Sequence, residues 1–144
     1  MDGSSNYQIV QLIRFEDSYR KLIKNHYKRD TKSRELFQSQ INGFISKMLE
    51  NPSSTDLSDD ENFPKGAFVR GYNFRKIRFR MPGLDGSASL GRLMYVIFEE
   101  KKLIFPLWVY THAEFPKRPH DADLRQEFVL IKNYIEEPTQ KEDK

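Results

Sequence analysis

The sequence contains no cysteine, no apolar run long enough to cross a membrane, and almost no excess of one charge. Without cysteine the chain forms no disulfide, thiolate metal site or thiol nucleophile, which favours a reducing compartment. The first residues lack the basic and apolar regions of a signal peptide. We therefore expect a soluble, cytoplasmic protein with no membrane partner. Because 24 Lys and Arg oppose 21 Asp and Glu, for a net charge of +3, only the distribution of charge along the chain can indicate a partner.

The composition is sufficient for a single domain over residues 1–144. A hydrophobic fraction of 38%, with 13% aromatic residues, supports a core and excludes wholesale disorder. Residues 1–6 and 137–144 are polar and are expected to be disordered. Residues 52–73 begin with an acidic stretch that has no periodicity, so we predict a long solvated loop there.

The first half of the chain predicts a pair of helices. After a short strand over Tyr7–Ile13, apolar residues at helical spacing indicate a helix over Phe15–Tyr27 and a second helix that stops at Asn51-Pro52. Asp30 or Thr31 is the expected N-cap of the second helix. The short, charged connection between the two predicts an antiparallel hairpin.

The second half is rich in strands. Alternation predicts strands over Phe74–Met81, Arg92–Glu99 and Leu103–His112, with an edge position or a bulge at Pro106. A third helix, capped by Asp121, closes the chain. Separate runs of helices and strands indicate the α+β class. We expect a small, antiparallel-rich sheet with the N-terminal helix hairpin and the C-terminal helix packed on one face, which leaves the other face open.

The strand Phe74–Met81 carries the clearest functional signal. Because side chains alternate between faces, its basic residues Lys76, Arg78 and Arg80 share one surface. A row of cations beside an aromatic residue, here Phe74, suits an RNA backbone with a stacked base. The alternative is an ordinary solvated strand face whose anionic partners lie on a neighbouring strand, although the predicted neighbours carry few acids at their centres.

Titratable residues gather at the ends of the other two strands. A histidine side chain in general titrates near neutrality, so a histidine such as His112 could give or take a proton during RNA cleavage, and Glu114 could orient it or act as a base. A lone histidine is more often a structural hydrogen-bonding residue, and this alternative stays open. His26 and His120 have weaker cases, and three dispersed histidines lack metal-ligand spacing, so no metal site is expected.

Five short segments follow one another in an order that is typical of one protein family. They are a strand leading into a helix hairpin that ends in Leu49-Glu-Asn-Pro52, then Phe74-Arg-Lys-Ile-Arg78, Gly91-Arg-Leu-Met-Tyr95, the strand Ile104–Tyr110 and a closing helix. In this order they resemble the RelE/ParE toxin superfamily, in its RelE and HigB branches. The resemblance implies a RelE-like fold and a type II toxin–antitoxin toxin that cuts mRNA on the ribosome. It also implies metal-free attack by a ribose 2′-OH, no cofactor, and a cognate antitoxin as partner.

The same resemblance assigns roles by position. Lys76 and Arg78 match the basic strand that holds the RNA backbone and serves in proton transfer, and Arg92 matches the arginine that stabilises the reacting phosphate. The chain departs from the family where a basic residue is usual just after the last strand. Either His112 replaces it, or it is displaced to Lys117 and Arg118. The expected catalytic residues are Lys76, Arg78, Arg92, His112 and Glu114. The expected substrate-binding residues are Phe74, Arg80, Tyr95, Tyr110, Lys117 and Arg118.

Two other function classes stay open on the sequence alone. One is a ParE-like inhibitor that binds gyrase and cleaves nothing. The other is a non-catalytic domain that binds RNA or a protein and uses the basic strand for affinity only. A histidine and an acid close to the cations would favour the enzyme, and their absence from the basic face would favour the binding domains.

Overall fold

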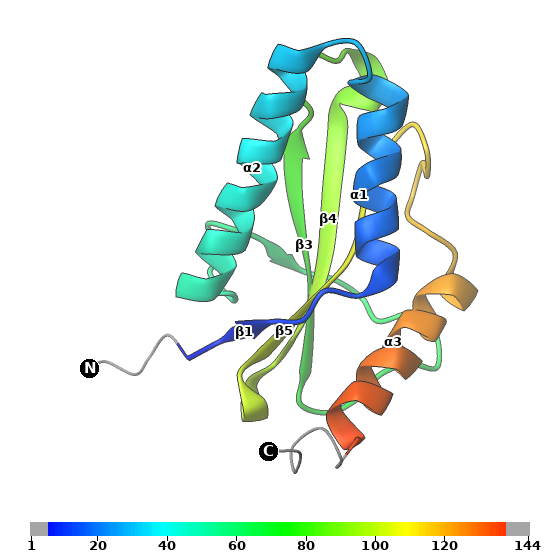
Figure 1. Cartoon of the computed structure of the whole chain (residues 1–144). Coiled ribbons are helices and arrows are strands. Elements are labelled where there is room, and N and C mark those ends of the chain that lie inside the picture. The colour runs from blue at the N-terminus through cyan, green and yellow to red at the C-terminus, as the bar shows by residue number, and fades with distance from the viewer. Residues whose placement is uncertain (1–5, 138–144) are drawn as a thin grey trace.

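Three antiparallel strands form the centre of the computed structural model, which describes residues 6–137 (Figure 1). They are β3 (Tyr72–Arg80), β4 (Leu90–Phe98) and β5 (Leu103–Thr111). β1 (Gln8–Ile9) pairs parallel with β5, and β2 (Asp59–Asp60) pairs antiparallel with β3. The strand order is β1-β5-β4-β3-β2, which confirms the α+β class with a mainly antiparallel sheet. The ends predicted to be disordered lie almost wholly outside the described residues.

Two helices form the predicted hairpin. α1 spans Ile13–His26 and α2 spans Thr31–Glu50. The Asp30 carboxylate caps α2 by accepting a hydrogen bond from the Ser33 backbone N–H at 3.0 Å, as predicted. β1 is shorter than predicted because the chain is already helical from Ile13. None of the helices within residues 6–137 is long and apolar enough to cross a bilayer.

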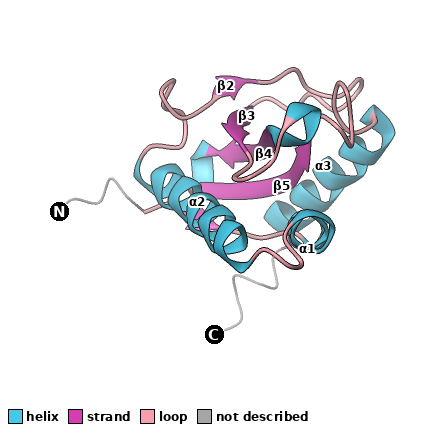
Figure 2. Cartoon of the chain, turned by 90° about the horizontal axis from the view of Figure 1, so that it is seen from above, coloured by secondary structure: helices cyan, strands magenta, loops and turns pink. Residues whose placement is uncertain are grey.

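The hairpin packs on one face of the sheet. Figures 1 and 2 show α1 and α2 side by side against the strands. In β3 and β4 the buried residues beneath the helices occupy odd-numbered positions, as the alternation of a strand requires. The main buried residues of this cluster are Phe15 and Leu22 of α1, Phe37, Ile41 and Met48 of α2, and Ile77, Leu93, Tyr95 and Ile97 of the strands.

α3 (Asp121–Glu136) packs on the opposite face and lies apart from the hairpin, at the lower right of Figure 1. Its Phe128 and Ile131 belong to the same buried cluster as Phe74 and Val96. The sequence had placed all the helices on one face. The difference arises because the even-numbered residues at this end of β3 and β4 are apolar too, so α3 buries them. The basic end of the same face keeps Arg78 and Arg80 exposed.

The N-terminus of α3 also differs from the prediction. The N-cap is His120, which makes no side-chain capping bond, rather than Asp121. Asp121 lies in the first turn, where its carboxylate accepts hydrogen bonds from the Lys65 backbone N–H at 3.1 Å and from Arg118 at 3.0 Å. Its carboxylate therefore ties the helix start to two neighbouring loops instead of capping it.

Pro106 coincides with a bulge, one of the two predicted possibilities. The β4–β5 register shifts between Met94 and Tyr95, and Tyr95 lies opposite Pro106. Proline has no N–H to donate to a ladder, so the irregularity falls where a regular bond is impossible. Beyond the bulge, the register sets Tyr110 opposite Arg92.

Residues 52–73 are mostly loop and turn, but they contain a short strand that the sequence did not predict. Asp59 and Asp60 form β2, and the Glu61 backbone N–H donates to the Phe74 carbonyl at 2.8 Å. Asp59 lies opposite Lys76 in this pairing. We call Asp59–Glu61 the acidic segment. The polar residues here are held to the edge of the sheet because β3 would otherwise leave a row of backbone groups unpaired.

Arg75 holds the start of this region against the sheet. Its guanidinium donates to the Ser58 hydroxyl and the Ser58 carbonyl, both at 2.7 Å, and pairs with Asp60 at 2.8 Å. Tyr95 adds a second anchor, since its hydroxyl donates to the Pro52 carbonyl at 2.6 Å. Arg75 and Tyr95 lie opposite each other on the hairpin face, so both anchors act on the same side.

Gly91→Ala should lower the free energy of unfolding by about 1–3 kcal/mol. A Cβ at this position would lie 2.5 Å from the ring of Phe79, which lies opposite Gly91 and packs on Phe44. Urea denaturation measures the effect. Gly43→Ala is the matched control: nothing lies within 4 Å of the added methyl group, and helix propensity predicts a gain of about 0.5–1 kcal/mol. Equal stability of the two variants would contradict the close packing of Phe79 on Gly91.

Candidate functional site

Two arginines lie directly opposite each other on the face away from the hairpin. Arg78 of β3 faces Arg92 of β4, and directly opposed like charges destabilise a sheet. The Arg78 side chain is 55% exposed, whereas Arg92 is partly buried. Burial lowers the pKa of the Arg92 guanidinium, and the charge of Arg78 lowers it further. No carboxylate within residues 6–137 pairs with Arg92, so the charge of Arg92 is available to an external anion.

Tyr110 of β5 continues the row from Arg92. The residue is fully buried, and its hydroxyl has no hydrogen-bond partner among the described residues. Burial raises the pKa of the Tyr110 hydroxyl, and Glu61 raises it further, while Arg92, Arg118 and Arg78 act in the opposite direction. The hydroxyl is therefore protonated at neutral pH, and because almost none of it is open to solvent, it can donate to an external anion only when the side chains that cover it move. We call the side of the sheet that carries Lys76, Arg78, Arg80, Arg92 and Tyr110 the cationic face.

His112 lies one row further along the cationic face. Its backbone N–H donates to the Leu90 carbonyl at 2.9 Å, and Leu90 lies opposite Arg80. Arg80 is exposed and donates to the Ser89 hydroxyl at 3.0 Å. The imidazole of His112 is partly exposed, and no described residue forms a hydrogen bond with it. The register therefore brings His112 and Arg80 next to the row of Arg78, Arg92 and Tyr110.

Lys76 shares this face but is not open to solvent, contrary to the prediction. It is 9% exposed, and its ammonium group lies 3.1 Å from the Glu61 carboxylate. Glu61 also pairs with Arg118 at 2.8 Å, and its side chain is 13% exposed. Removing one partner of a buried ion pair leaves an uncompensated charge, so this arrangement keeps Lys76 neutralised.

Asp59 supplies the counter-ion of Arg78. The guanidinium and the carboxylate are 3.2 Å apart, and both side chains are more than half exposed. The anionic partners that the sequence did not find on the central strands therefore come from the acidic segment. Lys76 and Arg78 thus have anionic partners on a neighbouring strand or segment, as the alternative to an RNA-binding strand requires. Arg80 and Arg92 do not, because no carboxylate among residues 6–137 pairs with either of them.

An open groove of about 430 Å³ adjoins the cationic face at Glu61 and Arg118. Lys117 and His120 also line it, just before the start of α3. Arg118 crosses one side of the groove, because its guanidinium pairs with both Glu61 and Asp121. Two of the predicted binding residues, Lys117 and Arg118, therefore come together here.

Three predicted site residues take no part in the exposed surface formed by the arginines of the cationic face. Phe74 is 1% exposed and packs edge-on against Phe128, and Tyr95 is fully buried on the hairpin face, so neither can stack on a base. The Glu114 carboxylate lies 3.3 Å from the ammonium group of Lys21 on α1. Among the described residues, no hydrogen bond or ion pair joins Glu114 to the His112 side chain.

The sequence-based prediction missed Asp59 and Glu61. An acidic stretch without periodicity is usually a solvated loop, so the sequence predicted a loop here. The available signal was the order of charges, because the three consecutive acids 59–61 precede a strand with four cations at 75, 76, 78 and 80. Such an order is consistent with an edge strand that pairs with the basic one.

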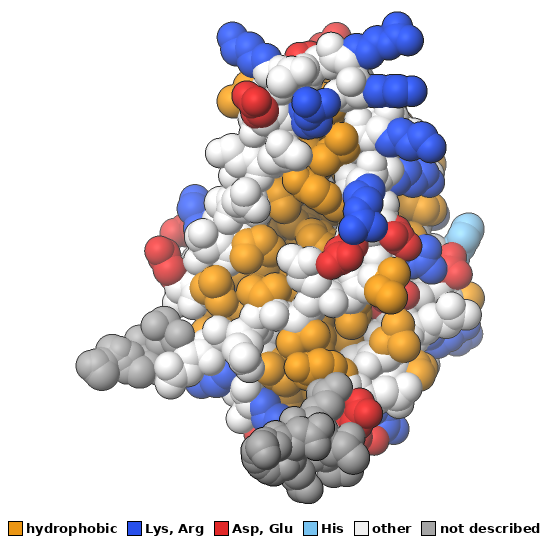
Figure 3. Space-filling view, in the orientation of Figure 1, with side chains coloured by type: hydrophobic (Ala, Val, Ile, Leu, Met, Phe, Trp, Pro, Cys, Tyr) orange, Lys and Arg blue, Asp and Glu red, His pale blue; other side chains and the backbone are white. Residues whose placement is uncertain are grey.

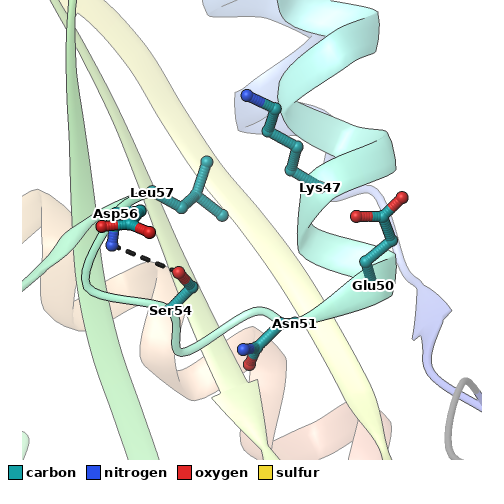
Figure 4. Close-up of a pocket in the computed structure, with 6 residues that line it drawn as sticks. All are labelled: Lys47, Glu50, Asn51, Ser54, Asp56 and Leu57. Atoms are coloured by element: carbon teal, nitrogen blue, oxygen red, sulfur yellow. Dashed lines mark hydrogen bonds between the residues drawn. The ribbon is translucent and has the colours of Figure 1, made fainter.

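A separate pocket of about 220 Å³ lies where α2 ends (Figure 4). In it the Asp56 backbone N–H donates to the Ser54 hydroxyl at 3.2 Å. The remaining lining residues are Lys47, Glu50, Asn51 and Leu57. None of the residues of the cationic face lines this pocket, so its shape adds nothing to that site.

Further Lys and Arg side chains gather around the α1–α2 connection, at the upper end of Figure 3. Figure 3 views the hairpin side of the sheet, where hydrophobic side chains line the furrow between the two helices. Exposed cations of this region are Lys24, Lys28, Arg29 and Lys32. They form a second basic surface outside the cationic face.

No family model matches this chain, and no curated protein matches it significantly. Across residues 6–137, no group of three or more His, Asp or Glu side chains is arranged to hold a metal ion. Function therefore has to be inferred from the cationic face together with the resemblance of the sequence segments.

Tyr95→Phe and Tyr110→Phe should have opposite effects. Tyr95→Phe removes a hydroxyl that bonds to both Pro52 and Ser58 at 2.6 Å, so the free energy of unfolding should fall by about 1–3 kcal/mol with RNA affinity unchanged. Tyr110→Phe removes a hydroxyl without a partner among the described residues, so stability should hold while RNA affinity falls. Urea denaturation and RNA titration on both variants measure this. Loss of RNA binding by a stable Tyr95→Phe protein would return Tyr95 to the site.

Proposed function

We propose that this chain is a RelE/HigB-like toxin that binds RNA on the cationic face and cleaves mRNA at the ribosome. The observation that carries the proposal is the row of Arg78, Arg92 and Tyr110, where two opposed guanidinium groups stand next to a buried hydroxyl without a described partner. A phosphate bound there would relieve the repulsion between the arginines and accept the hydrogen bond of the hydroxyl. The order of the RelE-like segments along the sequence supports the same function.

The proposed chemistry is attack of a ribose 2′-OH on the adjacent phosphate. The 2′-oxygen forms a bond to phosphorus, the bond to the 5′-oxygen breaks, and a cyclic phosphate remains. The 2′-OH gives up its proton to a base, and the leaving 5′-oxygen receives one from an acid. Arg92 and Arg78 stabilise the additional negative charge on the phosphorane, and the protonated Tyr110 hydroxyl donates a hydrogen bond to it.

His112 is the proposed proton-transfer group, because it is partly exposed next to the row of Arg78, Arg92 and Tyr110 and an imidazole can both accept and donate a proton. It would act without Glu114, whose carboxylate pairs with Lys21. This separation is also the observation that favours a second candidate, a domain that binds RNA without cutting it, since no described carboxylate orients the imidazole. Cleavage measurements on purified protein decide between the two.

The proposal includes the cellular setting that the resemblance implies. A toxin of this kind works in the cytoplasm on mRNA held by the ribosome, and a cognate antitoxin keeps it inactive. Induced expression of the chain alone should stop translation and fragment mRNA while DNA supercoiling stays normal. Changed supercoiling with intact mRNA would instead indicate a ParE-like gyrase inhibitor.

Arg92→Gln should weaken RNA binding about ten- to a hundredfold, because it removes charge-assisted hydrogen bonds to phosphate. The dependence of log Kd on log salt should also become shallower by about 0.7. Titration of a labelled single-stranded RNA across salt concentrations measures both. Arg20→Gln is the control with the same charge change, because Arg20 lies on α1 and pairs with Glu16 and Asp17. Equal losses for the two variants would show only general attraction to positive charge.

His112→Ala should lower the cleavage rate by about 10²–10⁴-fold while RNA affinity and thermal midpoint stay near those of the unchanged protein. Glu114→Gln is the control, and its cleavage should be normal. If His112 is structural, the midpoint falls and cleavage per folded molecule persists. Full cleavage by a folded His112→Ala protein would transfer the proton-transfer role to another group near the arginines, with Glu61 the first to test.

A further inference from the structure

We propose that the acidic segment competes with RNA phosphates for the cationic face, so that RNA has to displace the Asp59 carboxylate from Arg78 in order to bind. The inference rests on the proposed function, since it concerns the regulation of the same surface. It adds a built-in anionic competitor to that surface and a residue that sets its affinity for RNA.

Each of the three residues of the acidic segment forms an ion pair with a different cation of β3. Asp59 pairs with Arg78 at 3.2 Å, Asp60 with Arg75 at 2.8 Å, and Glu61 with Lys76 at 3.1 Å. Alternation along the segment assigns these pairs to two faces. Asp59 and Glu61 serve the cationic face, and Asp60 serves the hairpin face. Two carboxylates therefore occupy positions on cations that RNA phosphates would otherwise contact.

Contacts other than those with Arg78 and Lys76 hold the acidic segment in place. The buried Arg75 guanidinium and the Tyr95 hydroxyl hold Ser58 from the hairpin face, and the Glu61 N–H bonds to the backbone of β3 at 2.8 Å. Asp59 is therefore kept beside Arg78 at a high effective concentration, even when the ion pair between them is broken. An anion held in this way is a competitor for every phosphate that approaches Arg78.

The two competing carboxylates differ in how easily they are displaced. Asp59 and Arg78 are 66% and 55% exposed, and ion pairs this exposed are weak and exchange readily. Glu61 and Lys76 are 13% and 11% exposed, so separating them would leave buried charges unpaired. RNA should therefore displace Asp59 and leave Glu61 in place, which makes Arg78 the exchangeable cation of the face.

Asp59→Asn in the full-length protein tests the inference. The probe is a short single-stranded RNA with 2′-O-methyl riboses, which cannot be cleaved, so binding is measured apart from catalysis. Asp59→Asn should bind this RNA about two- to fivefold more tightly, with a salt dependence of log Kd steeper by about 0.7. Asp60→Asn is the matched control, because it removes the same charge one residue away but on the other face, and the asparagine side-chain oxygen can still accept the hydrogen bond of Arg75. It should change Kd less than Asp59→Asn does.

A double-mutant cycle assigns the effect to the right cation. In an Arg78→Gln background, Asp59→Asn should tighten binding no more than Asp60→Asn does, because its competing partner is gone. Thermal midpoints of all variants confirm that each protein is folded, which the exposure of Asp59 favours.

The outcomes separate this inference from the proposed function. If Arg92→Gln weakens RNA binding but Asp59→Asn binds no more tightly than Asp60→Asn, the competition is refuted and the RNA site stands. If Asp59→Asn tightens binding equally with and without Arg78, general repulsion is the cause and the competition is again refuted. If RNA binding is unaffected by Arg92→Gln, the proposed function and this inference fall together.

Discussion

The buried guanidinium of Arg75 organises the half of the molecule that carries the cationic face. It is 4% exposed, and a charge removed from water to this extent is tolerated only when its hydrogen bonds are made inside the protein. Ser54, Ser58 and Asp60 provide them, and all three belong to the stretch that precedes β3. Satisfying Arg75 therefore requires that stretch to lie along the sheet edge. The acidic segment reaches the cationic face as a consequence of this requirement.

The sheet separates two kinds of chemistry along the length of the same strands. At one end of the face that bears α3, Phe74 and Val96 are covered by Phe128 and its neighbours. At the other end, the same alternation presents Arg78 and Arg92 to the surface. A rigid, buried half thus fixes the positions of the charged half, because strands that pair over nine residues transmit their register from end to end. Groups that act together on a phosphate need positions defined in this way.

The charges of the cationic face are balanced unevenly. Lys76 is neutralised by a buried carboxylate, and Arg78 by an exposed one. Arg92 has no carboxylate partner within residues 6–137, and it stands beside the unpaired hydroxyl of Tyr110. The face therefore contains a buried ion pair, an exposed ion pair and, at Arg92, an arginine without a carboxylate partner among residues 6–137. In the proposed function, Arg92 is the arginine that acts on the reacting phosphate.

The sequence by itself determined the helices and the three central strands, and the side of β3 that each residue occupies, because periods of 3.6 and 2 are local properties of the chain. It thus identified the helix hairpin, the alternation of Ile77 with Lys76 and Arg78, and the irregularity at Pro106. Only the tertiary structure decided which groups meet. The strand register placed Arg92 opposite both Arg78 and Tyr110. Phe74 and Tyr95 are buried, so neither has a surface role. The pairing of β2 with β3 brought Asp59 and Glu61 to the basic strand. Those contacts join residues that are distant in the chain, and the free energy that selects them comes from packing and charge pairing between elements.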